Sequence, residues 1–389
     1  MSKRIGKSLV ANGVTLVTEA AWNEELNAKH EKLVEWMRGQ GLAGVLIRRN
    51  ENVAWVTDGA VELRVLTPCE TGVASLLVTA AGKRYYLTTE NEAPRLQDEE
   101  FGALDFEPVL FPWYADDTVA AAARLAGGPL GSDAPGASTP GPGLTPVNLY
   151  PLRAALSETE IARFRWLGAE TADATVEALH QVEPGLSEYD LEAMTAAGLL
   201  RRGIQPSVYL YAVDERILQY KHAVVRGKRL KQYGMLNLCA RKWGLAISIT
   251  RFVHFGGLPK ELASRFEAAA QVNAALLTAT RAGATSAELF RVAQAAYAAQ
   301  GFPGEERFHH QGGATGYWER EWVATPQGAE VVVNDQAFAW NPSIRGGKVE
   351  DTVLLHDGVI ENLTATPELP VIAASVEGST YAAAGVLVK

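Results

Sequence analysis

The sequence has few cysteines, no long apolar run and no excess of positive charge. Its two cysteines, Cys69 and Cys239, match no zinc or redox spacing, and we expect buried thiols in a reducing cytoplasm. No apolar run approaches the roughly 20 residues that span a bilayer. The first residues also lack the uninterrupted apolar stretch of a signal peptide. These absences argue against a membrane protein and against a secreted disulfide scaffold, and they predict a cytoplasmic location.

The charge balance argues against a nucleic-acid partner. The formal net charge is −9, whereas affinity for nucleic acid depends on clustered lysine and arginine. The hydrophobic content of 47% and the charged content of 21% are ordinary for a globular protein. With 389 residues the chain can form two or three domains with a large core.

The first part of the chain alternates helical and strand patterns. The expected elements are a helix at about 22–40 ended by Gly41, a buried strand at 43–47 followed by a second apolar run at 53–57, and a hairpin of 72–79 with 84–88. This alternation predicts a small α/β domain.

A stretch rich in glycine and proline, residues 127–151, predicts a surface connection. We place the domain boundary there, which gives domains of residues 1–151 and 152–389. Ser157 and Glu160 then form a capping-box pattern that predicts the start of a long helix.

The second domain contains a weak internal repeat. Residues 183–191 (EPGLSEYDL) and 281–289 (RAGATSAEL) each follow a long helical pattern, with glycine and leucine at the same offset. A duplicated helix–turn–helix unit predicts a pseudo-twofold α+β domain. Chance similarity between two short polar turns is the alternative.

Between the repeats, two apolar runs predict a β-hairpin. They cover residues 235–239 and 245–250, and alternation with period two places Asn237 and Ser248 on inward positions of neighbouring strands. Small polar residues inside apolar strands either satisfy a core hydrogen bond or form the wall of a site.

This hairpin resembles the first metal-ligand segment of the pita-bread superfamily, which contains prolidase, aminopeptidase P, methionine aminopeptidase and creatinase. Gly244, Thr250 and Arg251 keep the superfamily pattern. In the metallopeptidases two aspartates stand eleven residues apart in this segment, and here Asn237 and Ser248 occupy those positions.

A second segment, residues 309–321, is similar to the superfamily's histidine- and glycine-rich motif. Three residues agree with it without a gap: Gly312, Gly316 and Glu321. In this register Gly313 stands where the superfamily has a metal-binding histidine, and Arg320 stands at a substrate-side histidine. A different register, which stays open, would put His310 in the ligand role.

Two further segments complete the resemblance, which covers nearly the whole chain. Residues 337–342 place Asn341 at a glutamate ligand position, and residues 347–354 retain the last ligand as Glu350. Only one of five ligand positions therefore keeps a carboxylate or an imidazole. Divalent cations need several carboxylate or imidazole ligands, so we expect no dinuclear metal site and no cofactor.

The resemblance implies a fold and an assembly. The fold is α+β, with a C-terminal pita-bread domain of pseudo-twofold symmetry after a smaller α/β N-terminal domain of the creatinase type. The superfamily usually dimerises, so we expect a homodimer that binds a small-molecule or dipeptide-like ligand.

The resemblance also implies site residues. His222 stands where creatinase, a metal-free member, has a histidine that accepts and donates a proton on a C–N bond, and imidazole is the commonest general acid/base. Glu350 is the second catalytic candidate, and as a buried carboxylate it needs a partner from the substrate or from a protein arginine. The expected substrate-binding residues are Arg320, Glu321, His309, His310, Tyr317, Asn237, Ser248 and Asn341.

Three functions remain open from the sequence. The first, which we favour, is a metal-independent hydrolase of a small amidino or amide substrate. The second is a non-catalytic, peptidase-like binding protein. The third is a residual Xaa-Pro dipeptidase or aminopeptidase, which the loss of metal ligands disfavours.

Overall fold

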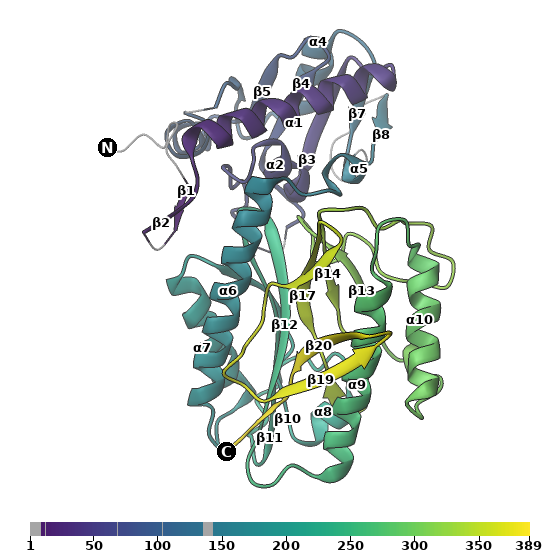
Figure 1. Ribbon diagram of the computed structural model, residues 1–389. Coiled ribbons are helices and arrows are strands. Elements are labelled where there is room, and N and C mark those ends of the chain that lie inside the picture. Colours follow the sequence, from purple (N-terminus) through teal and green to yellow (C-terminus); the bar gives the residue numbers. More distant parts are fainter. Residues whose placement is uncertain (1–8, 12, 68, 103, 135–142) are drawn as a thin grey trace. The chain divides into compact units, whose positions relative to one another are not determined.

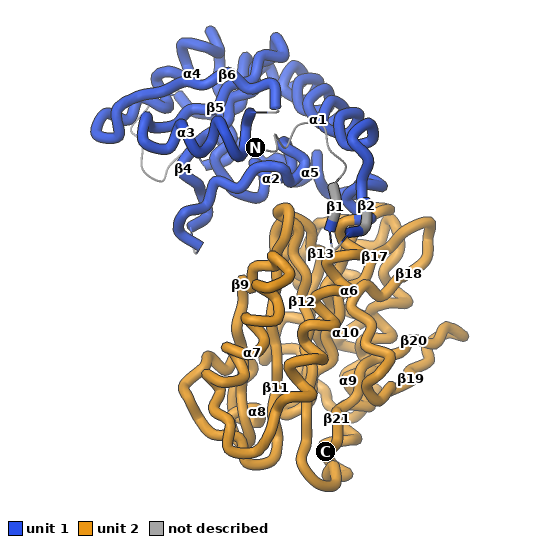
Figure 2. Tube along the Cα trace, turned by 90° about the vertical axis from the view of Figure 1, so that its left-hand side faces the viewer, with its two compact units in different colours: residues 1–162 blue, residues 163–389 orange. Residues whose placement is uncertain are grey.

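The structure of the chain is a computed structural model that describes residues 9–11, 13–67, 69–102, 104–134 and 143–389. The chain divides into two compact units, residues 1–162 and 163–389 (Figure 2). The fold class expected from the sequence, a smaller α/β unit followed by an α+β pita-bread unit, is confirmed.

Unit 1 is built on a six-stranded mixed sheet. The strand order is β6-β5-β4-β3-β7-β8, with β3 Gly44–Arg49, β4 Thr71–Thr79, β5 Arg84–Thr89, β6 Glu107–Phe111, β7 Leu130–Ser132 and β8 Leu144–Pro146. The other elements are β1 Leu9–Ala11, β2 Val14–Val17, α1 Glu19–Gly39, α2 Asn50–Val56, α3 Ala93–Arg95, the π-helical turn η1 Leu96–Phe101, α4 Thr118–Ala126 and α5 Tyr150–Arg153.

The elements predicted for the start of the chain are largely present. Helix α1 ends before Gly41, whose φ of +67° favours glycine, and β4 pairs with β5 as the expected hairpin. The apolar run 53–57 lies mostly in helix α2. Part of the predicted connection 127–151 forms strands β7 and β8 at one edge of the sheet, and its residues 135–142 lie outside the described residues.

Unit 2 contains two packed sheets and two pairs of long helices (Figure 1). One sheet has the order β10-β11-β12-β21 with β9 on β11, from β9 Gln205–Tyr209, β10 Ala212–Val213, β11 Tyr233–Lys242, β12 Leu245–His254 and β21 Val386–Val388. The other has the order β13-β14-β17-β18, from β13 Gly312–Thr315, β14 Gln336–Trp340, β17 Asp351–His356 and β18 Val359–Asn362.

The helices and short hairpins of this region follow the same chain order. They are α6 Glu158–Gln181, α7 Glu188–Arg201, α8 Glu215–Gln219, α9 Lys260–Ala279, α10 Ser286–Ala299, the 3₁₀ turn η2 Glu305–Arg307, β15 Ser343–Ile344, β16 Gly347–Lys348, β19 Val371–Val376 and β20 Ser379–Ala384. The division between the units falls within α6. The expected domain boundary at 151/152 stays a prediction.

The internal repeat is visible as two equivalent turns. Gly185 and Gly283 both have positive φ, +95° and +88°, which a residue with a side chain rarely adopts. Each turn leads into a 14-residue helix, α7 or α10, whose N-terminus is closed by a capping box on Ser187 or Thr285. The similarity of the two segments is therefore structural, not chance.

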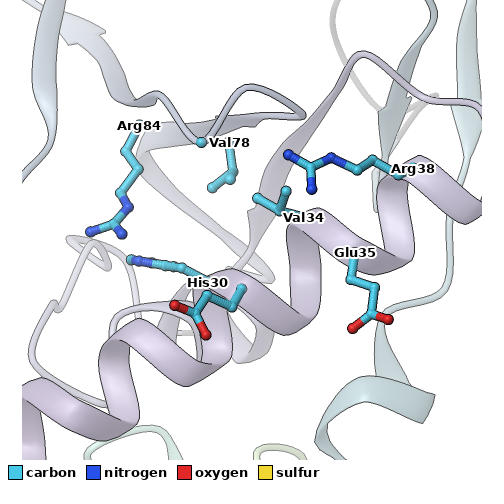
Figure 3. Close-up of a pocket in the computed structure, with 8 residues that line it drawn as sticks. His30, Val34, Glu35, Arg38, Val78 and Arg84 are labelled. Atoms are coloured by element: carbon cyan, nitrogen blue, oxygen red, sulfur yellow. The ribbon is translucent and has the colours of Figure 1, made fainter.

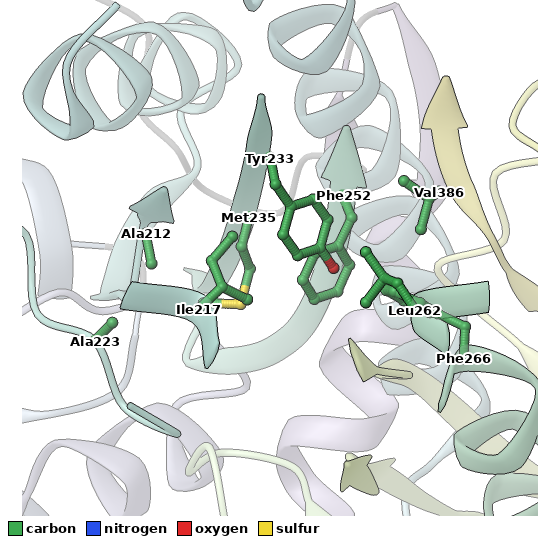
Figure 4. Packing of buried hydrophobic residues seen from close by; sticks show 9 residues of the cluster. All are labelled: Ala212, Ile217, Ala223, Tyr233, Met235, Phe252, Leu262, Phe266 and Val386. Atoms are coloured by element: carbon green, nitrogen blue, oxygen red, sulfur yellow. The ribbon is translucent and has the colours of Figure 1, made fainter. Parts of the chain in front are cut away.

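The β11–β12 hairpin is held at one end by an aromatic cluster (Figure 4). Tyr233 stacks on Phe252 with ring centroids 5.6 Å apart, and Phe252 meets Phe266 edge-on at 4.9 Å. The hydroxyl of Tyr233 donates to the carbonyl of Gly346. These contacts fix the hairpin against α9 and against the segment that leads to Glu350.

No helix within the described ranges is both long and apolar enough to cross a membrane.

A buried lysine organises the end of unit 1. The ammonium of Lys29 lies 2.7 Å from Glu25, 2.5 Å from Asp58 and 2.6 Å from Glu160, all of them buried. Glu160 also closes the predicted capping box with Ser157. Burial, together with the neighbouring Asp58, raises the pKa of Glu25 to about 7. The Lys29 ammonium group therefore places a positive charge against all three carboxyl groups.

We predict that Lys29→Met lowers the free energy of unfolding by about 3–5 kcal/mol at pH 7, because three buried carboxyl groups lose this cation. Urea denaturation measures the change. The control is Lys83→Met, since Lys83 is exposed and 3.7 Å from the exposed Glu107; it should change stability by less than about 1 kcal/mol. Equal effects of the two substitutions would contradict the assignment.

Candidate functional site

The candidate site lies on one face of the β11–β12 hairpin. Asn237 pairs with Thr250 and Cys239 with Ser248 in the antiparallel register, so all four side chains project from the same face. The sequence prediction that Asn237 and Ser248 share a face is confirmed. Both residues are buried.

Glu350, which directly precedes β17, is the acidic centre of this face. Three neutral side chains donate to its carboxylate: Asn237 Nδ2 to Oε2 at 2.9 Å, Thr250 Oγ1 to Oε2 at 2.5 Å and Asn341 Nδ2 to Oε1 at 3.3 Å. Asn237 Nδ2 also donates to Thr250 at 2.6 Å. The carboxylate is 3% exposed, so these bonds replace its hydration.

Two protein cations complete the surroundings of Glu350. Arg320 Nη2 lies 2.8 Å from Oε1 and Lys348 Nζ lies 2.8 Å from Oε2. Burial would raise the pKa of Glu350, but Lys348, Arg320 and the hydrogen bonds hold that pKa far below its ordinary value of 4.5. Each carboxylate oxygen thus faces one positive charge, and the group stays ionised.

The hydroxyl of Ser248 contacts both Arg320 and Cys239. Arg320 Nη1 donates to Ser248 Oγ at 2.8 Å, and the Cys239 thiol lies 3.1 Å from the same oxygen. Burial raises the pKa of Cys239 to about 12. The thiol is therefore not ionised near neutral pH and does not serve as a nucleophile.

Three histidines gather beside this centre. The Nε2 atoms of His222 and His309 are 2.9 Å apart, and the rings of His309 and His310 stack with centroids 4.5 Å apart. The ring centroids of His222 and His310 are 5.9 Å apart. The structure thus brings together His222, which follows α8, and two histidines from the segment before β13.

Neighbouring residues fix both histidine segments. Lys221 Nζ contacts Glu305 at 2.7 Å and Ser343 O at 3.1 Å, which ties the residue before His222 to the η2 turn. Gln311, fully buried, accepts from Tyr297 at 2.7 Å and donates to the carbonyl of His309 at 2.5 Å. These contacts therefore fix the positions of both histidine segments.

The histidine pKa values are lowered. Burial is the largest cause for each. Lys348 lowers all three pKa values further, Arg320 lowers those of His222 and His310, and Glu350 opposes these shifts. The pKa falls to about 2 for His309 and to about 4 for His310, and that of His222 lies below 6.5. All three imidazoles are neutral near pH 7, which leaves them able to accept protons.

The remaining predicted site residues support the loop between β13 and β14. Glu321 Oε1 accepts from the backbone N–H groups of Tyr317 and Trp318, at 3.0 and 3.2 Å. Tyr317 is fully buried. At Gly313 a Cβ atom would lie 2.1 Å from the carbonyl oxygen of Trp322, so the backbone leaves no space for a side chain there.

Lys348 and Thr250 are the site residues that the sequence reasoning missed. Lys348 lies two positions before Glu350, and the alternation of an extended chain could have placed both on the same side. The sequence indicates Thr250 only as part of the superfamily pattern. Thr250 lies 100 residues before Glu350, and local patterns do not connect two such distant segments.

A separate cavity lies in unit 1 (Figure 3). It measures about 500 Å³, and His30, Arg38 and Arg84 are among the residues that line it. Burial, with Arg84 nearby, lowers the pKa of His30 to about 4. The residues that line this cavity are apolar or charged, with one histidine among them. The face around Glu350 instead combines a carboxylate, two cations and three imidazoles.

The profile of Metallopeptidase family M24 matches residues 163–357, just over half of the chain. The chain belongs to family M24. The match includes the hairpin, the three histidines and Glu350, so the candidate site lies entirely within the M24 region. No curated protein sequence matches this M24 protein significantly.

Solved structures share the fold at low sequence identity. An Xaa-Pro dipeptidase from Bacillus anthracis superposes with a TM-score of 0.73 at 17% identity, over 94% of this chain and 100% of that one. A prolidase from Pyrococcus horikoshii OT3 gives 0.70 at 20% identity, over 87% and 99%. The N-terminal domain of the FACT complex subunit SPT16 from Cicer arietinum gives 0.63 at 12% identity, over 87% and 96%.

We predict that Glu350→Gln lowers the free energy of unfolding by about 3–5 kcal/mol at pH 7, because Lys348 and Arg320 lose their common anion. The wild-type protein should also lose stability as pH falls below 4.5: the folded pKa of Glu350 is depressed, so its contribution is present above the unfolded pKa and disappears on acidification. Urea titrations between pH 3 and 7 measure both effects.

The matched control is Glu361→Gln. Glu361 forms a bidentate pair with Arg165, but both side chains are about 40% exposed. This substitution should cost less than about 1 kcal/mol. The Glu350 prediction fails if Glu350→Gln is as stable as Glu361→Gln.

Proposed function

We propose that this M24 protein is an Xaa-Pro peptidase-like hydrolase that acts on a C–N bond of a small substrate without the family's dinuclear metal centre. The observation that carries the proposal is the pairing of both Glu350 oxygens with cations of the protein itself, Arg320 and Lys348. A guanidinium and an ammonium group then supply the positive charge that two metal ions supply in the metallopeptidases.

The donor set beside Glu350 does not fit two divalent ions. At the ligand positions assigned by resemblance, Asn237 and Asn341 donate their amide hydrogens to Glu350, and Ser248 accepts from Arg320. Gly313 has no side chain and no space for one. Hard cations are bound by several carboxylate or carbonyl oxygens, whereas this set offers one carboxylate that is already neutralised.

Imidazole is the group that remains for proton transfer. In the free protein His309 Nε2–H donates to His222 Nε2, because the opposite tautomer would bury an N–H at His309 Nδ1 that has no acceptor among the described residues. A water and a substrate that enter beside His222 replace this hydrogen bond. His222 Nε2 then takes a proton from the water as its oxygen attacks the carbonyl or amidino carbon. The same proton passes to the leaving nitrogen as the C–N bond breaks.

The local charge indicates the substrate class. Arg320 and Lys348 together outweigh Glu350 by one positive charge, and the three imidazoles are neutral near pH 7. This excess favours a ligand with a carboxylate next to the amide or amidino group. A dipeptide-like molecule or a small amidino acid satisfies both requirements.

A binding protein without catalysis is the second candidate. The match to a FACT complex subunit indicates that the fold also occurs in a protein whose description is not that of a peptidase. Such a protein would use the same contacts of Arg320 and Lys348 but would not need a base. A residual metal-dependent Xaa-Pro dipeptidase is the third candidate, and the chemistry of the donor set disfavours it.

We predict that His222→Ala lowers kcat/KM for a hydrolysed dipeptide or amidino acid by about 10²–10⁴-fold, the usual contribution of a general acid/base. Ligand affinity, measured by calorimetry, should change far less. The matched control is the exposed His180→Ala, which should leave activity unchanged. In the wild type, kcat/KM should fall on acidification with an apparent pKa below 6.5, because His222 must be neutral to accept a proton.

Two outcomes distinguish the other candidates. Equal and modest losses of turnover and affinity in His222→Ala would favour the binding protein. Cleavage of Xaa-Pro dipeptides that requires added cobalt or manganese and disappears with a chelator would establish the metallopeptidase.

We also propose, from the family resemblance, that the protein is a cytoplasmic homodimer. Light scattering after size exclusion should give twice the mass of the 389-residue chain. A monomeric mass at micromolar concentration would contradict the dimer.

A further inference from the structure

The proposed proton transfer does not explain why three histidines lie close together. Each of His222, His309 and His310 offers a ring nitrogen, and these three nitrogen atoms all lie within 4.8 Å of one another. Proton transfer needs only one base and one partner to orient it. The third imidazole therefore calls for a separate explanation.

The distance between His222 and His309 lies close to that between two ligands of one metal ion. In a tetrahedral zinc site with Zn–N bonds of about 2.0–2.1 Å, ligand nitrogens are about 3.3 Å apart. His222 and His309 would separate by only a few tenths of an ångström from their present 2.9 Å, and His310, whose ring nitrogen lies within 4.8 Å of both, would move closer. Three histidine ligands with one open position form a common zinc coordination set.

The position of the cluster in the fold also suits a metal ligand set. His309 and His310 are adjacent in sequence, and His222 comes from a segment that Lys221 ties to the η2 turn just before them. His222 is exposed, which gives an ion access from solvent, while His309 is buried. Neutral imidazole suits zinc and other transition metals and does not suit calcium or magnesium.

We propose that His222, His309 and His310 form a mononuclear site for a transition-metal ion such as Zn²⁺, distinct from the family's dinuclear site, and that occupation of this site inhibits the hydrolase. The inhibition rests on the proposed function, because the metal takes the His222 lone pair that accepts the proton. The binding itself does not depend on that function.

Three local features limit the affinity. Arg320 and Lys348 repel a cation, which Glu350 offsets only in part. His309 Nδ1 has no hydrogen-bond partner among the described residues, and the absence of such a partner typically costs a metal-binding histidine 10–100-fold in affinity. His310 Nδ1 already accepts a 3.2 Å hydrogen bond from the Gly312 N–H. We therefore expect reversible binding in the micromolar range, which suits a regulatory ion more than a permanent one.

Calorimetry with ZnCl₂ on the full chain tests the binding. The expected result is one ion per chain, with affinity at least ten-fold weaker in His310→Ala and in His309→Gln and unchanged in His180→Ala. Circular dichroism verifies that each variant is folded. Cobalt(II) should give the intense visible absorption of a tetrahedral site, and this absorption should disappear in His310→Ala even where a residual affinity remains.

The outcomes separate this proposal from the proposed function. Absence of zinc binding, or binding that the histidine substitutions do not change, overturns the metal site. Binding without any effect on turnover, while His222→Ala is inactive, overturns the inhibition and leaves the site. Activation by one equivalent of zinc, lost in His310→Ala, keeps the site but overturns the metal-independent mechanism.

Discussion

The candidate site depends on the pairing of the buried carboxylate of Glu350 with two cations. Arg320 and Lys348 each lie 2.8 Å from one of its oxygens, and three neutral side chains donate to the same group. An isolated charge at this depth would cost several kcal/mol. Hydrogen-bond donors and cations beside Glu350 are therefore stabilised. A further buried carboxylate at this position would lack a counter-charge.

The fold supplies this network from distant parts of the sequence. The β11–β12 hairpin contributes Asn237 and Thr250, the loop after β13 contributes Arg320, and the segment before β17 contributes Lys348 with Glu350. The aromatic cluster around Tyr233 and the repeated helix pairs fix the hairpin in place (Figures 1 and 4). Rigid strands hold the charged groups within hydrogen-bond distance, as a preorganised site requires.

Much of this fold was accessible from the sequence because its signals are local. The Ser157–Glu160 capping box, the positive-φ turns at Gly185 and Gly283, and the period-two alternation around Asn237 each depend on neighbouring residues. Strands β7 and β8 were not predicted, because three-residue strands amid glycine and proline owe their existence to pairing within the sheet, not to their own composition.

The site was predictable only in part, for the same reason. Family resemblance placed Glu350, Arg320 and His222, but the sequence could not tell whether Arg320 contacts substrate or Glu350. Nor could it reveal the short distance between His222 and His309. These contacts arise from tertiary packing across about 30 to 110 residues.

A buried carboxylate can be stabilised in a fold when arginine and lysine provide positive charge at its two oxygens. Family membership then predicts the architecture, while the side chains beside the carboxylate determine which chemistry the site can perform. For this M24 protein we propose imidazole chemistry in place of metal-bound water.

Anomalous diffraction from crystals grown with manganese or cobalt tests the central claim most directly. We expect no anomalous peak within coordination distance of the Glu350 carboxylate, which should remain paired with Arg320 and Lys348. Two peaks about 3.5–4 Å apart beside Glu350, the spacing of dinuclear hydrolase centres, would contradict the account.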